Sequence, residues 1–220
     1  MVLLGPTVRS LRELLACCES YAQTHGLLYN VAKSEFMVFK ASGEKCPDSV
    51  PAIRLNGNEL NRVYQFKHLG HYVTDDLRDH VDIERERRAL AVRCNMLARR
   101  FARYSKEVKV TLFKAYCQVF YTCSLWAGYT LRTISALRVQ YNNGFRKLME
   151  LPCFCSASAH AHVDDFHAII RQKSASLLCR VRASSISILK TIAGSYKNKK
   201  KMNMEKQKKI LQERNKKSTS

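Results

Sequence analysis

The sequence has few acidic residues and no long apolar run. Asp and Glu total 18 of its 220 residues against 38 Lys and Arg, which gives a formal net charge of +20 at pH 7. No segment approaches the ~20 apolar residues that a transmembrane helix needs, and the apolar start MVLLGPTVRS is too short for a signal peptide. These absences argue against a membrane partner and against secretion, and they predict a soluble, intracellular protein.

Motifs of several enzyme classes are also missing. The sequence contains no Gly-rich phosphate loop, no HExxH and no Ser-His-Asp arrangement. Its nine cysteines are odd in number and lack the spacing of a disulfide framework, which indicates free thiols in a reducing compartment. We therefore expect no small-molecule substrate and no disulfide-stapled fold.

Positive charge is the abundant feature of the chain. A surface this basic attracts polyanions, so nucleic acid is the first partner to consider. Residues 196–220 hold ten Lys or Arg and two Glu, which leaves a net charge of +12 for residues 1–195. The body is basic without its tail. We expect the tail to be disordered or a frayed helix, and its lysines make the nucleus a candidate compartment.

The first third of the chain alternates between helical and strand patterns. Apolar residues between positions 11 and 22 recur at helical spacing, with Thr7 or Ser10 as possible caps and Gly26 as a left-handed stop. Residues 36–40 and 52–55 alternate like strands, and residues 64–74 are typical of a hairpin around Leu69-Gly70. The apolar run at residues 1–4 resembles half of another hairpin.

From Arg78 onward the hydrophobic pattern is helical. Ile83, Leu90, Cys94, Leu97 and Phe101 share one side of the first predicted helix. The opposite side carries a stripe of arginines, which comprises Arg85, Arg88, Arg99 and Arg103. Further helices are predicted at about 108–123, at 131–151, where Pro152 ends the pattern, and within 163–192.

Two blocks carry a resemblance to a known family. GLLYNVAKSEFMVF spans Gly26 to Phe39, and YQFKHLGHYVTDD spans Tyr64 to Asp76. Their order resembles the reverse transcriptases of non-LTR (LINE-type) retrotransposons. The resemblance implies that the first block closes the palm, that the second grips the primer, and that three thumb helices follow. It places residue 1 just after the Asp-Asp motif that holds the catalytic Mg²⁺ ions of the intact family.

The same resemblance suggests site residues. Lys33 matches the lysine thought to protonate the leaving pyrophosphate, although its spacing alone also fits a solvated loop cation. The primer-grip positions are Phe66, His68, Leu69 and Gly70. The arginine stripe would lie along the phosphates of a duplex, where contacts position the protein without specifying sequence, although such a stripe also fits an ordinary solvated face.

Metal sites are not expected in this chain. Asp75 and Asp76 follow Tyr72 like a polymerase dyad, but one residue too late, and Asp76 or Asp79 is better placed to cap the arginine-rich helix. Asp164-Asp165 is typical of another helix start. The cluster Cys153–His162 has the wrong spacing for a zinc knuckle. We expect no cofactor here, and Mg²⁺ only for the intact family.

Together these patterns predict an α+β, mostly helical fold. Its expected parts are a small antiparallel palm remnant with the hairpin (1–76), a three-helix thumb-like bundle (77–152), a further helical segment (153–195) and the basic tail (196–220). The predicted function is that of a truncated reverse transcriptase, inactive alone, that contacts RNA or an RNA/DNA duplex. The alternatives are a small basic, non-catalytic RNA- or DNA-binding helical protein, and a chain whose unpaired strands prevent stable folding.

Overall fold

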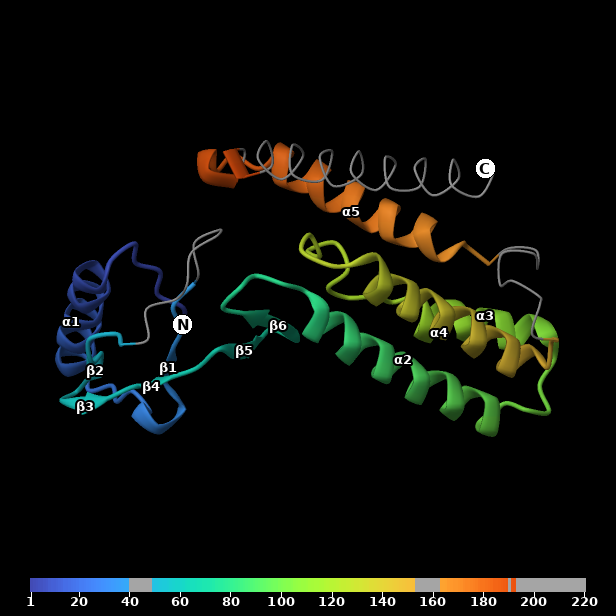
Figure 1. The fold of residues 1–220 in the computed structure, drawn as a ribbon, viewed down its shortest axis with the longest axis horizontal. Helices are drawn as coiled ribbons and strands as arrows, with labels where there is room; N and C mark the ends of the chain where they lie inside the picture. The colour runs from blue at the N-terminus through green and yellow to red at the C-terminus, as the bar shows by residue number, and fades with distance from the viewer. Residues whose placement is uncertain (40–48, 153–162, 190, 193–220) are drawn as a thin grey trace, which may run out of the picture. The chain divides into compact units, whose positions relative to one another are not determined.

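The structure is a computed structural model that describes residues 1–39, 49–152, 163–189 and 191–192. The chain divides into two compact units that meet between Arg78 and Asp79. Within the described residues, the first unit combines a helix with short strands and the second contains helices only (Figure 1). The described part of the chain is α+β and mostly helical, as the sequence predicts. The cluster at 153–162 and the tail at 196–220 lie outside it.

Helix α1, Val8–Thr24, begins and ends at sequence signals. The Thr7 hydroxyl accepts a hydrogen bond from the Ser10 N–H at 3.1 Å, and the Ser10 hydroxyl accepts one from the Thr7 N–H at 3.1 Å. This reciprocal capping box satisfies two backbone donors that the first turn leaves free. Gly26 follows the helix with φ of +63°, a conformation that glycine adopts without strain. Of the two alternative caps, Thr7 is confirmed as the N-cap with Ser10 at position N3 of its capping box, and the predicted stop at Gly26 is confirmed.

Short strands pack beside α1 in the first unit. A 3₁₀ turn, Val31–Lys33, precedes β1 (Glu35–Phe36), and β2 (Arg54–Leu55), β3 (Asn58–Glu59) and β4 (Asn61–Arg62) follow. Strands β2 and β3 pair antiparallel, whereas β1 pairs parallel to β4, a pairing that the sequence does not predict. The core of this unit is formed by Leu15, Ile53, Leu55 and Leu60.

The predicted hairpin half at residues 1–4 is wrong. These residues form no strand, and Met1 and Leu4 are exposed at 83% and 75%. Leu3 alone packs against the core of the unit. An apolar run of four residues gains little as a strand when no neighbouring strand accepts its backbone hydrogen bonds.

The predicted hairpin at residues 64–74 is confirmed. Strands β5 (Gln65–His68) and β6 (His71–Thr74) pair antiparallel, with His68 opposite His71. The turn residues Leu69 and Gly70 have φ of +47° and +83°. A two-residue hairpin whose twist matches its strands needs positive φ at both positions, which glycine supplies freely and leucine only with strain.

The second unit is a helical bundle of α2 (His80–Arg100), α3 (Lys106–Cys117), α4 (Leu131–Met149) and α5 (Phe166–Ala183). Helices α2 and α4 pack along each other, and α3 contacts both (Figure 1). Aromatic residues fill the core: Phe113 lies 5.0 Å from Phe145 and 5.2 Å from Tyr141 between ring centroids. Phe166 at the start of α5 joins this core through an edge contact with Phe120 at 5.5 Å.

Two helix ends differ from the sequence prediction. Helix α2 ends at Arg100, so Arg103 lies in the turn that follows and not on the helix. Helix α3 ends at Cys117 instead of continuing to position 123. Residues 121–125 fold into turns, because this path buries Cys123 and carries Trp126 back to α2.

Candidate nucleic-acid interface

Helix α2 carries a buried carboxylate at its first turn. Asp82 is fully buried, and its Oδ2 accepts hydrogen bonds from the Thr122 hydroxyl at 2.6 Å and the Trp126 indole N–H at 2.8 Å. Its Oδ1 accepts a hydrogen bond from Arg85 Nε at 2.9 Å. Both carboxylate oxygens of Asp82 therefore have hydrogen-bond partners, as a buried ionised group requires. The Asp82 cluster ties the turn at 121–126 to α2.

A second buried carboxylate extends this cluster. Glu86 is 2% exposed and lies 3.2 Å from a terminal nitrogen of Arg85 and 2.5 Å from one of Arg93. Two carboxylates therefore face two guanidinium groups, and their formal charges cancel. Arg85, predicted for the nucleic-acid face, is only 27% exposed and its charge is committed to Asp82 and Glu86. Its place in the structure is that of an internal ion-pair partner.

The two predicted capping aspartates stabilise turns. Asp79 stands at the N-cap of α2, but its side chain makes no capping hydrogen bond. Its Oδ2 instead accepts hydrogen bonds from the backbone N–H groups of Ala127 and Gly128, both at 2.7 Å. Asp76 accepts hydrogen bonds from the Thr74 hydroxyl at 2.7 Å and from the Arg78 N–H at 3.1 Å. Neither carboxylate caps α2 as the sequence predicts.

Arg88 is exposed but shares its charge. Its Nε lies 2.9 Å from Glu84, which also accepts two hydrogen bonds from Arg87 at 2.7 Å. The hydrogen bonds from Arg87, with a smaller contribution from Arg88, lower the pKa of Glu84 to about 2. Because the side chain of Arg88 is 76% exposed, it can still reach an external anion.

Three exposed arginines lie close together in the sequence where α2 ends. Arg99, Arg100 and Arg103 are exposed, and the ion pairs that the described part of α2 makes involve other arginines. The sequence Arg99–Lys106, RRFARYSK, also contains Phe101 and Tyr104. We call these eight residues the basic turn. Sequence inspection for helical periodicity selects Arg99 and Arg103 but misses Arg100 and Tyr104, although the local alternation of cations and aromatics marks them.

Cations outnumber acidic residues in the bundle, and most of them lie on its surface. Residues 79–152 hold 14 Lys or Arg and 6 acidic residues. Asp79, Asp82 and Glu86 are buried, and Glu84 and Glu150 are engaged in ion pairs. The acids are thus largely withdrawn from solvent or neutralised, whereas most arginines are on the surface. The outward field of this unit is positive.

The predicted site residues of the first unit lie apart in two places. Lys33 is exposed at the end of the 3₁₀ turn, where its backbone N–H donates to the Asn30 side-chain oxygen at 3.1 Å. On the hairpin, His68 and Leu69 are exposed and Phe66 is half-buried, with 6.3 Å between the rings of Phe66 and His68. No contact described for these residues brings Lys33 to the hairpin.

The described carboxylates do not fit a polymerase metal site. Among the described residues there is no group of three or more His, Cys, Asp or Glu that could hold a metal ion. Asp75 is buried, and Asp76 is occupied by Thr74 and Arg78. Two-metal phosphoryl transfer needs carboxylate oxygens that converge on open coordination positions. We therefore derive no catalytic step through Mg²⁺.

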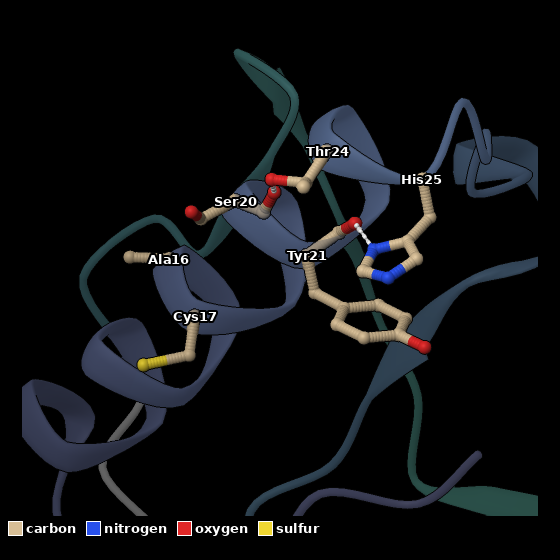
Figure 2. Close-up of a pocket in the computed structure, with 6 residues that line it drawn as sticks. All are labelled: Ala16, Cys17, Ser20, Tyr21, Thr24 and His25. Atoms are coloured by element: carbon tan, nitrogen blue, oxygen red, sulfur yellow. Dashed lines mark hydrogen bonds between the residues drawn. The ribbon is translucent and has the colours of Figure 1, made fainter.

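The hollow on α1 offers no catalytic constellation. It is lined by Ala16, Cys17, Ser20, Tyr21, Thr24 and His25, all from α1 and its C-cap (Figure 2). The rings of Tyr21 and His25 stack at 4.0 Å, and His25 Nδ1 lies 2.9 Å from the Tyr21 carbonyl oxygen. Cys17 lies apart from the His25 ring (Figure 2), so the two do not form a thiol–imidazole pair.

A thiol pair is buried between helices of the second unit. Cys94 on α2 and Cys117 on α3 lie 3.5 Å apart between sulfur atoms, and both are shielded from solvent. The hydrogen bond between them and their burial raise the pKa of Cys117 well above its usual value. Cys117 is therefore an inert, protonated core residue at neutral pH.

None of the family models, curated proteins or solved structures compared with the chain matches it. Among the helices of the described residues, none is both long and apolar enough to cross a membrane. The case for function therefore rests on the residues of this chain.

Proposed function

We propose that this chain binds nucleic acid through its sugar-phosphate backbone, as a palm-end and thumb-like part of a reverse-transcriptase type of protein. The observation that carries the proposal is the segregation of charge in the second unit. Of the six acids at residues 79–152, five are buried or paired and only Glu107 is exposed without an ion pair, while Arg99, Arg100 and Arg103 are exposed at the end of α2 and in the turn that follows. Phosphate contacts of this kind position a duplex without reading its sequence.

The sequence blocks supply the second line of support. The confirmed hairpin presents His68 and Leu69 to solvent next to Gly70, the arrangement that the family resemblance assigns to a primer grip. A glycine there allows close approach of a backbone because it has no side chain. Lys33 is exposed and available as a further cation. We propose RNA or an RNA/DNA duplex as the ligand of both units.

Salt dependence provides the test of this proposal. Three phosphate contacts give a slope of log K against log salt of about −2.7 on a duplex, so affinity should fall roughly 40-fold between ~50 and ~200 mM salt. Replacing one contacting arginine, as in Arg99→Gln or Arg103→Gln, should make the slope shallower by about one unit. Fluorescence anisotropy with a labelled RNA/DNA duplex measures both quantities.

Arg9→Gln is the matched control for this experiment. Arg9 is an exposed arginine of the first unit that pairs with Glu13 at 3.0 Å, outside the basic turn. We expect Arg9→Gln to leave the salt slope unchanged. An absence of duplex and RNA binding at ~50 mM salt would refute the proposed function, and equal effects of Arg9→Gln and Arg99→Gln would refute its assignment to the basic turn.

A further inference from the structure

The basic turn carries an aromatic pair among its cations. Phe101 packs against the core of the second unit, and its ring meets that of Tyr104 edge-on at 5.2 Å between centroids. The Tyr104 N–H donates to the Phe101 carbonyl at 3.2 Å, which closes the turn. Phe101 therefore links Tyr104 to the core, while Tyr104 itself is 55% exposed.

Cations flank the exposed ring on both sides in the sequence. Arg99 and Arg100 precede it at the end of α2, Arg103 is its neighbour, and Lys106 begins α3. Glu107 is the one acidic residue between positions 99 and 110. An exposed aromatic held within a cationic segment is the combination that proteins use for single strands, where bases stack on the ring and cations follow the backbone.

We propose that Tyr104 is a stacking site for an unpaired base of an RNA or DNA strand, with Arg99, Arg100 and Arg103 holding the flanking phosphates. This inference rests on the proposed function and adds that the nucleic acid is unpaired where it contacts Tyr104. A base inside a duplex is covered by its neighbours and cannot stack on Tyr104. The arginines can therefore follow the backbone of a duplex, as proposed above, whereas Tyr104 adds affinity only where the bound strand is unpaired, such as the stretch next to a duplex end.

The test compares Tyr104→Ala with Tyr104→Phe on four probes: a single-stranded oligonucleotide, the same strand with abasic positions, a blunt duplex and a glutamate polymer of similar charge. Tyr104→Ala should weaken binding of the intact single strand about tenfold, because base stacking on an aromatic is of this size. Tyr104→Phe keeps the ring and should bind like the wild type. Neither variant should change the affinity for the abasic strand, the duplex or the glutamate polymer.

The outcomes separate the two proposals. If the wild type binds the duplex and Tyr104→Ala binds the single strand equally well, the stacking site is refuted and the proposed function stands. An equal loss on intact and abasic strands, or on the glutamate polymer, also refutes stacking and indicates a general change of the surface. If the wild type binds no nucleic acid, both proposals fail. Because Tyr104 is mostly exposed, thermal melting of each variant checks that its fold is intact.

Discussion

Removal of the Asp82 carboxylate is the most decisive perturbation of the second unit. Asp82 is fully buried and accepts hydrogen bonds from Arg85, Thr122 and Trp126. Asp82→Ala leaves the Arg85 guanidinium without this partner and deprives two buried donors of their acceptor. Breaking one side of a buried ion pair costs about 3–5 kcal/mol of unfolding free energy. We expect the loss to fall in this range.

The conservative variant refines the argument. In Asp82→Asn one amide oxygen can still accept from Thr122 and Trp126, but the amide NH₂ then faces the Nε–H of Arg85. Two donors cannot bond to each other, so one is left unsatisfied at a cost of about 1–3 kcal/mol. The matched control is Glu84→Gln on the same helix, where a partly exposed pair is worth about 1 kcal/mol or less.

Trp126 makes the measurement specific to this unit. It is the single tryptophan of the chain and is 1% exposed, so its fluorescence follows unfolding of the second unit alone. At a typical urea slope of about 1–3 kcal/mol/M, Asp82→Ala should lower the midpoint by at least ~1 M. Circular dichroism should give the same midpoint. A loss below ~1 kcal/mol, no larger than that of Glu84→Gln, would refute the reasoning that this buried cluster holds the turn to α2.

Two further predictions concern helix packing and pH. A Cβ at Gly144 on α4 would clash with the Cys94 sulfur on α2, so Gly144→Ala should destabilise the second unit by about 1–3 kcal/mol in urea unfolding. A neutral effect would contradict the close approach of α2 and α4. The pKa of Glu84 in the folded state is about 2, below its usual value near 4.5, so its contribution is full above about pH 4.5 and is lost as the pH falls toward 2. The stability difference between wild type and Glu84→Gln is modest because the pair is partly exposed, and it should shrink in urea titrations taken from about pH 5 to pH 3. A difference that grows on acidification would oppose this assignment.

Local signals in the sequence account for the elements that depend on neighbouring residues. The capping box at Thr7 and Ser10, the left-handed Gly26 and the turn at Leu69-Gly70 all act within a few positions, so they can be predicted without knowledge of the fold. Helical periodicity from Arg78 onward likewise predicts the apolar side of α2. The same reasoning predicts the positive charge, which depends on composition alone.

Long-range contacts decided the rest. Periodicity places Arg85 with Arg88 and Arg99 on one cationic stripe. In the structure Arg85 instead joins the buried carboxylates of Asp82 and Glu86. This cluster forms because Thr122 and Trp126 return to α2 through a turn some 40 residues away in the chain. The parallel pairing of β1 with β4 and the end of α3 at Cys117 also depend on partners distant in sequence. The sequence by itself determined the helices, the hairpin and the excess of cations, since each follows from local or summed properties. Only the tertiary structure decided which cations face solvent, because an arginine is withdrawn from the surface only where folding brings a buried carboxylate to it.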